Sequence, residues 1–260
     1  MVSSGDGRGA PAPLARRDVN PAWFVGAALR SAVRLPRTAH GLFLRTVINQ
    51  IRFTAVQGIP LLVFVAAVFG VPLALSVAPL TAALGVSDAA DRILVTLVIR
   101  ELGPIVAALL VVVRSGTAVV AELAAARVTG ERDALEALGV DPLQYYVLPR
   151  IVAFAVSVAL LSLFFDAVVL GALSIARVRA GGGADFASLL ATSAAGADVW
   201  LTVVKGMLFG AGIATFASME GLEAGDNAVA IPIAVSRGTV QAFVWVFLAS
   251  AVLAAIRFLA

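Results

Sequence analysis

Long apolar runs separated by short polar segments dominate the chain and predict five membrane-spanning helices. The first run, residues 59–80, contains 22 residues without a charge. At a rise of about 1.5 Å per residue, that length crosses a hydrocarbon core of roughly 30 Å. The other four runs are predicted at residues 93–120, 151–176, 199–218 and 238–256. The pattern therefore predicts an all-α polytopic membrane protein, in which residues 58–260 form the five-span domain.

The segments between these runs are predicted as loops at 81–92, 177–198 and 219–237, with a longer charged connector at 121–150. In the loop at 177–198, a turn at Gly181-Gly182-Gly183 precedes a run with apolar residues at helical spacing. This run predicts a short helix that contains Phe186, Leu189 and Leu190.

The first 57 residues differ from the rest of the chain. Residues 1–19 are rich in Gly, Pro, Ala and Arg without an apolar run, which predicts a disordered cytoplasmic tail. Residues 20–57 are predicted as two interfacial helices that are broken near Pro36. In the second helix, apolar residues recur at helical spacing at Phe43, Val47, Ile48, Ile51 and Ala55. The opposite side of that helix carries Arg45, Asn49 and Arg52. This two-sided pattern favours a helix in the headgroup region of an anionic leaflet, and the alternative is a soluble helix packed on a cytoplasmic partner.

The distribution of arginine predicts the orientation in the membrane, because cytoplasmic segments carry an excess of positive charge. With the N-terminus inside, the inner segments carry Arg8, Arg16, Arg17, Arg30, Arg34, Arg37, Arg45, Arg52, Arg127, Arg132, Arg150 and Arg237. The outer loops carry only Arg92, Arg177 and Arg179. We therefore expect a cytoplasmic N-terminus and a cytoplasmic connector, and we assign the basic charge to orientation instead of nucleic-acid binding.

Composition excludes several chemistries. The chain is 61% hydrophobic with a mean hydropathy of +1.01, and it has no Cys and a single His, His40. A disulfide framework, a zinc finger, an iron–sulfur cluster and a Cys nucleophile are therefore excluded. The sequence contains no HExxH, GxSxG, Walker A or GxGxxG pattern. We expect no metal site, no catalytic residues and no nucleotide bound by this chain.

The connector contains one short predicted helix. Thr129 can cap its N-terminus, and Glu131 and Asp133 in the first turn suit the helix dipole. Gly139 is the predicted stop, followed by Asp141-Pro142. A helical wheel places Arg132, Asp133 and Glu136 on one side and Ala134, Leu135 and Leu138 on the other. A nine-residue helix is too short to be stable alone in water, so it packs either on its own spans or in a partner's groove.

Charged residues inside the predicted spans are costly and are candidates for function. They are Arg100, Glu101 and Arg114 in span two, Asp166 in span three and Lys205 in span four. Pro104 cannot donate to the carbonyl of Arg100, which predicts a free carbonyl and a kink.

The spacing of these charges predicts where they face. The fourteen-residue spacing of Arg100 and Arg114 predicts that both face the same way. Glu101 is expected to pair with Lys205 or with an Arg of a second protomer. These charges either fasten the helices together or line a cavity for a polar or phosphate headgroup.

Several of these residues form an ordered series of motifs. The series runs through Arg100-Glu101-Leu102-Gly103-Pro104, Arg114-Ser115-Gly116, Ala121-Glu122-Leu123, Arg127-Val128-Thr129, Glu131, Asp133-Ala134-Leu135, Gly139-Val140-Asp141-Pro142 and Pro149-Arg150. Further on come Asp166, Lys205-Gly206, Phe209-Gly210 and Glu220-Gly221. In these motifs the chain, over roughly residues 45–260, resembles the MlaE/YrbE permease family, the membrane subunits of ABC lipid transporters that work with MCE proteins. Two departures are the stretch 227–235, where the family is Gly-rich, and Arg132, where the family usually has Gln.

The resemblance implies a homodimeric permease in the bacterial inner membrane that is not itself an enzyme. A separate cytoplasmic ATPase would bind ATP and Mg²⁺, an MCE-domain protein would be the periplasmic partner, and phospholipid would be the substrate. Residues 129–142 would be the coupling helix. Its predicted contact residues are Thr129, Glu131, Asp133, Leu135, Glu136, Leu138, Gly139, Asp141 and Pro142.

Two other functions compete with this interpretation. An ion-coupled secondary transporter would use Asp166, Glu101 and Lys205 as a relay, but it leaves the connector helix without a role. An intramembrane lipid enzyme is disfavoured because no nucleophile–base or metal set is present.

Overall fold

The structure is a computed structural model that describes residues 26, 40–84, 87–179, 183–194 and 197–259. Every element in this part of the chain is helical. Within it, five stretches are long and apolar enough to cross a membrane: Phe43–Ser76, Ala90–Val128, Leu143–Arg179, Val199–Leu222 and Ala230–Arg257. The all-α class and the five apolar spans are confirmed. The tail at 1–19 and the break at Pro36 lie outside the described residues.

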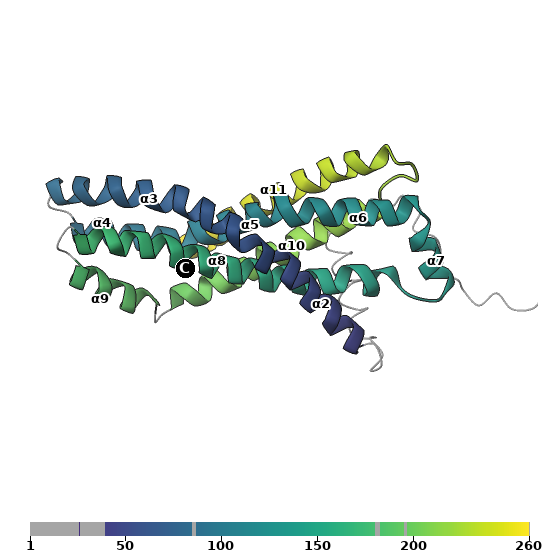
Figure 1. The fold of residues 1–260 in the computed structure, drawn as a ribbon, viewed down its shortest axis with the longest axis horizontal. Coiled ribbons are helices and arrows are strands. Elements are labelled where there is room, and N and C mark those ends of the chain that lie inside the picture. The colour runs from purple at the N-terminus through teal and green to yellow at the C-terminus, as the bar shows by residue number, and fades with distance from the viewer. Residues whose placement is uncertain (1–25, 27–39, 85–86, 180–182, 195–196, 260) are drawn as a thin grey trace, which may run out of the picture.

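Helices α8 (Leu148–Arg179) and α10 (Ala197–Leu222) lie side by side at the centre of the bundle (Figure 1). Their contact is close because Gly206 and Gly210 are four residues apart on one face of α10. A Cβ at Gly206 would lie 2.8 Å from the Cα of Ala159, and one at Gly210 would overlap the Phe154 carbonyl. This is the small-residue packing that brings helix backbones together in membranes.

The other helices surround this central pair. α2 (His40–Thr54), α3 (Ile59–Leu84) and α5 (Gly103–Val111) contact α8. α6 (Thr117–Val128) and α11 (Ala230–Leu259) contact α10. The short helix α7 (Glu131–Ala137) lies at one end of the bundle, and α4 (Ser87–Leu97) and α9 (Gly183–Ala194) lie at the other (Figure 1).

α2 buries one side and exposes the other, as its sequence predicts. Val47 is buried, as is Ala55 directly after the helix, whereas Arg45 and Arg52 are exposed. Ile48 is an exception, because its side chain is 54% exposed. The helix crosses the bundle obliquely and contacts α8 (Figure 1). Its place at the membrane interface stays a prediction.

Span two consists of three α-helices joined by two π-helical segments. α4, α5 and α6 are linked by η3 (Val98–Leu102) and η4 (Val112–Gly116). The loop predicted at 81–92 is wrong in large part, because α3 extends to Leu84 and α4 begins at Ser87. Ser and Asp, which we assigned to a loop, also favour the N-terminal turn of a helix.

The ends of spans three to five also extend past their predicted limits. The short helix predicted after Gly181-Gly182-Gly183 is confirmed as α9, which starts at Gly183 and buries Phe186. The loop predicted at 219–237 is shorter, because α10 ends at Leu222 and α11 begins at Ala230. The side chain of Asn227 accepts a hydrogen bond from the Ala230 N–H at 3.0 Å, which caps α11 before the predicted start at Gly238.

Candidate functional site

Two side chains of α10 hold the π-helical turn η3, the break in the regular α-helix before Pro104. The Gly103 N–H donates to the Val98 carbonyl, which forms the wide turn of η3. Thr202 Oγ1 donates to the Ile99 carbonyl at 2.6 Å, and Lys205 Nζ donates to the Arg100 carbonyl at 3.2 Å. The carbonyl predicted to be free therefore has a partner on a neighbouring helix. Neighbouring helices commonly satisfy backbone groups freed by proline within a membrane.

Glu101 pairs with Lys205, as the buried-charge argument predicts. Lys205 Nζ lies 2.5 Å from Glu101 Oε2, and Ser250 Oγ of α11 donates to the same oxygen at 3.3 Å. The Lys205 side chain is 3% exposed, and its ammonium lies 5.7 Å from the centre of the Phe209 ring. The pair joins span two, α10 and α11, so it holds three helices together.

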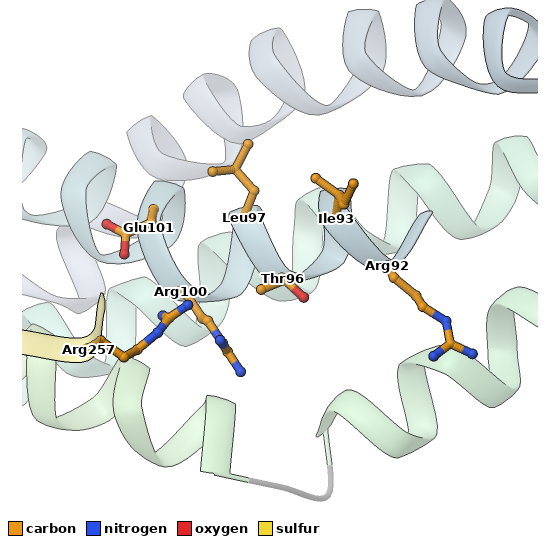
Figure 2. Close-up of a pocket in the computed structure, with 7 residues that line it drawn as sticks. All are labelled: Arg92, Ile93, Thr96, Leu97, Arg100, Glu101 and Arg257. Carbon is orange, nitrogen blue, oxygen red and sulfur yellow. The ribbon is translucent and has the colours of Figure 1, made fainter. Parts of the chain in front are cut away.

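A cavity of about 360 Å³ opens beside this pair. It is lined by Arg92, Ile93, Thr96, Leu97, Arg100, Glu101 and Arg257. Figure 2 shows the side chains of Arg92, Arg100 and Arg257 on one side of α4, with Arg100 and Arg257 next to each other. Three guanidinium groups stand against one carboxylate, and that carboxylate is already paired with Lys205. The cavity therefore favours an anion.

The same cavity also has an apolar side. Ile93 is 68% exposed and Leu97 is 46% exposed, and both belong to the apolar stretch 90–128. Apolar surface beside a cationic group suits an amphiphile, with a charged headgroup at the arginines and a hydrocarbon chain against the aliphatic side chains. The sequence did not indicate that Arg92 and Arg257 line this cavity, because arginines at the ends of spans resemble ordinary boundary residues.

Arg114 has a different role from Arg100. Its Nη1 donates to the Phe53 carbonyl at 2.8 Å, its Nη2 donates to Gln57 Oε1 at 3.2 Å, and the guanidinium lies 5.2 Å from the centre of the Phe53 ring. The prediction that Arg100 and Arg114 face the same way is wrong, because a π-helical turn takes an extra residue and shifts the helical register. Arg114 caps the C-terminal end of α2.

Asp166 of α8 packs against Gly103, directly before Pro104. It is 5% exposed, and a Cβ at Gly103 would overlap its carboxyl group. Among the described residues, neither of its carboxyl oxygens has a hydrogen-bond partner. It is therefore packed against span two and lies outside the arginine-lined cavity.

The connector helix α7 begins and ends at glycines in the left-handed conformation, Gly130 and Gly139, each with φ of 76°. The prediction that Thr129 caps this helix is wrong, because its hydroxyl donates back to the Ala125 carbonyl at 3.0 Å and ends α6. The predicted stop at Gly139 is confirmed. The Val140 N–H donates to the Leu135 carbonyl and the Gly139 N–H to the Glu136 carbonyl, both at 3.0 Å, which is a Schellman motif.

Polar contacts attach α7 to the bundle. Arg132 Nη1 donates to the Leu222 carbonyl at the end of α10, at 3.1 Å, and its Nε lies 3.0 Å from Glu136. The Tyr146 hydroxyl donates to Glu131 Oε1 at 2.7 Å. The helical-wheel prediction is wrong at three positions, because Arg132 is only 8% exposed whereas Ala134 is exposed and Leu138 is 78% exposed. The free carbonyls at the end of α10 bind the guanidinium in preference to a leucine.

The outer face of α7 combines apolar and acidic groups. Leu138 and Val140 are exposed, as are Asp133, Glu136 and Asp141. Asp141 also caps the next helix, because its Oδ1 accepts the Leu143 N–H at 2.9 Å beside Pro142. Leu135 differs, since it is half-buried and packs on the core. An exposed leucine between carboxylates is a surface that a partner protein can cover.

A second hollow of about 320 Å³ lies at the same end of the bundle, between the end of α10 and the start of α11. Glu220, Glu223 and Arg237 are among its lining residues. Burial, together with the neighbouring Glu220 carboxylate, raises the pKa of Glu223, and Arg127 and Arg132 oppose this effect. Arg127 also pairs with Asp226 at 3.0 Å. Among the described residues, no group of His, Asp or Glu side chains could hold a metal ion.

Comparisons with known proteins agree with this arrangement. The family described as Permease MlaE matches residues 47–256. A probable ABC transporter permease protein of Rickettsia felis is 33% identical over 143 residues, which are 55% of this chain and 53% of that protein. The intermembrane phospholipid transport system permease protein MlaE of Haemophilus influenzae is 31% identical over 163 residues, which are 62% of each chain.

A more distant relative comes from a plant. Protein TRIGALACTOSYLDIACYLGLYCEROL 1, chloroplastic, of Arabidopsis thaliana is 27% identical over 179 residues, which are 67% of this chain and 51% of that protein. The chain thus spans about half to three-fifths of the length of these curated relatives. The family match is longer and includes all five apolar stretches nearly in full. On that match, the chain belongs to the MlaE permease family.

Proposed function

We propose that this chain is the membrane permease subunit of an ABC transporter that moves phospholipid or a related lipid. A separate cytoplasmic ATPase would bind ATP and Mg²⁺ and drive transport, and an MCE-type periplasmic protein would exchange the lipid. Membership of the MlaE family and the name of the Haemophilus influenzae relative support this assignment. The observation that carries it is the cavity with three arginines and an aliphatic wall inside an apolar span.

The chemistry of the cavity fits a phospholipid headgroup. Guanidinium groups bind phosphate oxygens through paired N–H donors, and Arg100 and Arg257 lie next to each other in this cavity (Figure 2). Ile93 and Leu97 offer aliphatic contact to an acyl chain. This arrangement also argues against an ion-coupled relay through Asp166, Glu101 and Lys205, because among the described residues the Asp166 carboxyl group has no hydrogen bond to either of the other two.

α7 would be the coupling helix that transmits movement of the ATPase. It is attached through Arg132 to the end of α10, and the other part of α10 holds the break in span two through Thr202 and Lys205. One rigid helix thus connects the docking surface with the cavity. The excess of arginine at the α7 end supports a cytoplasmic location for that end, in the inner membrane of a bacterial cell.

A second copy of the chain would complete the transporter, as the resemblance implies. The exposed apolar row on α11 is available to a second protomer or to lipid; it includes Val240, Val244 and Phe247.

Replacement of the exposed leucine of α7 tests the docking. Leu138→Asp is expected to reduce recovery of the ATPase with the solubilised permease at least about tenfold, because a desolvated, unpaired carboxylate costs several kcal/mol. The permease should still fold, since Leu138 is 78% exposed and makes no core contact. The measurement is pull-down of the ATPase with tagged permease.

Val178→Asp is the control for this experiment. Val178 is 65% exposed and lies at the C-terminal end of α8. That end of α8 leads into α9, and α9 and α7 lie at opposite ends of the bundle (Figure 1). The ATPase should be recovered in full with that variant. Undiminished recovery with Leu138→Asp would remove α7 from the interface.

A further inference from the structure

A hydroxyl of α10 donates a hydrogen bond to a different helix. Thr215 Oγ1 donates to the Ala211 carbonyl of the same helix at 2.8 Å, which is the usual arrangement for a helical threonine. Thr202 Oγ1 donates to the Ile99 carbonyl of span two at 2.6 Å, so this hydroxyl links two helices. Thr202 is 0% exposed, so water cannot replace this bond.

The Thr202 bond is made at the turn that carries the charged residues. Ile99 lies within η3 and directly precedes Arg100 and Glu101. Thr202 and Lys205 are three residues apart on α10 and therefore project from the same face. Thr202 holds the carbonyl of Ile99, and Lys205 holds the carbonyl of Arg100 and the carboxylate of Glu101.

The geometry of this turn decides where Arg100 points. A π-helical turn is uncommon and less favourable than a regular α-helical turn, so it needs contacts that hold it. If the turn relaxed, the register between α4 and α5 would change by about one residue, and Arg100 would rotate away from Arg257 and the cavity. Ile99 is itself buried at 4% exposed, so its carbonyl is a fixed point for the two residues that follow.

We propose that Thr202 is a positioning residue, whose hydroxyl holds the π-helical turn that presents the Arg100 guanidinium to a lipid phosphate. The part that concerns lipid rests on the proposed function. The part that concerns the turn rests only on the hydrogen bond and the helix geometry. The two parts are therefore tested by separate measurements.

The first measurement uses amide hydrogen exchange. Thr202→Val keeps the shape of the side chain and removes the donor, so exchange of the amides at 98–103 should rise about fivefold, the effect of one buried hydrogen bond on a local opening equilibrium. Thr202→Ser keeps the donor and should restore slow exchange. Thr215→Val is the matched control, because Thr215 is 3% exposed and its hydroxyl bonds only within α10. It should leave exchange at 98–103 unchanged.

The second measurement uses the permease–ATPase complex in vesicles that contain phosphatidylglycerol and phosphatidylethanolamine in varied ratio. For Thr202→Val, the half-saturating fraction of phosphatidylglycerol should rise about fivefold while the maximal ATPase rate changes little. If Thr202 only stabilised the fold, Thr202→Val would instead reduce the amount of active protein, and the maximal ATPase rate would fall in proportion. Thr202→Ser should behave like the unmodified chain.

The outcomes separate the two hypotheses. Unchanged exchange at 98–103 in Thr202→Val, or an equal rise in Thr215→Val, would overturn the positioning role. If the unmodified complex shows no response to phosphatidylglycerol, the proposed function fails, and hydrogen exchange still decides the role of Thr202. If Thr202→Val does not give monodisperse protein, the comparison of Thr202→Ala with Thr202→Ser replaces it in both measurements.

Discussion

Glu101→Gln is expected to lower the lipid-stimulated ATPase activity of the reconstituted complex at least about tenfold, because it leaves the Lys205 ammonium buried without its carboxylate. The side chain of Lys205 is 3% exposed, and the neutral amide that replaces Glu101 cannot balance its charge. Lys205 would keep its bond to the Arg100 carbonyl and its place near the Phe209 ring, but it would lose its charged partner. The change therefore affects the turn that positions Arg100 as well as the contact between span two and α10.

Removal of both charges should restore part of this activity. Lys205→Met in the Glu101→Gln background replaces the stranded ammonium with an apolar side chain of similar length. Removal of one side of a buried pair usually costs more than removal of both. ATPase activity of the two single variants and the double variant, measured at equal amounts of folded complex, gives the coupling between the residues. Strictly additive losses would show that the two charges act independently.

Gly210→Leu is expected to abolish the folded bundle. Gly210 faces the backbone of α8 so closely that even a Cβ would overlap the Phe154 carbonyl, and neither backbone can give way as a flexible side chain does. Because α8 and α10 form the centre of the bundle, their separation would expose the contacts of both helices with α2, α3, α5, α6 and α11. The expected result is loss of the monodisperse peak in gel filtration of the detergent-solubilised protein.

Gly171→Leu is the control for size and hydrophobicity. Gly171 lies within helix α8, as Gly210 lies within helix α10, but a Cβ built at Gly171 meets no atom within 4 Å. This variant should elute like the unmodified chain and melt within a few degrees of it. A monodisperse Gly210→Leu protein of unchanged melting temperature would contradict the close packing of α8 on α10.

The helices could be predicted from the sequence better than their ends could. Apolar runs of membrane length can only be helical in the absence of a barrel pattern, so the five spans follow from composition. Ser87 begins α4 and Asn227 caps α11 in the structure, yet in sequence such residues look the same in a loop and in a cap. The π-helical segments have no pattern that we could recognise, because they depend on how neighbouring helices pack.

The part of the candidate site that could be predicted is the Glu101–Lys205 pair, because an unpaired charge is costly to bury inside a span. An isolated Glu101 inside a span needs a cation, and Lys205 was one of few available. Arg257 could not be assigned to the cavity, because its approach to Arg100 depends on the packing of α11 and not on sequence spacing. Arg132 was grouped with Asp133 and Glu136 on the helical wheel for a similar reason, since the sequence does not show that the end of α10 lies beneath it.

Capture of lipid inside the arginine-lined cavity is the decisive measurement. A photoreactive amino acid at Thr96, which lines the cavity, is compared with one at Leu75, which is 67% exposed on α3. Illumination of the complex in phosphatidylglycerol-containing vesicles should give a lipid adduct at both positions. ATP turnover should change the yield only at position 96, because only the cavity is emptied and refilled during transport. Absence of an adduct at position 96, or a yield there that does not respond to ATP, would contradict a lipid-transporting cavity at this site.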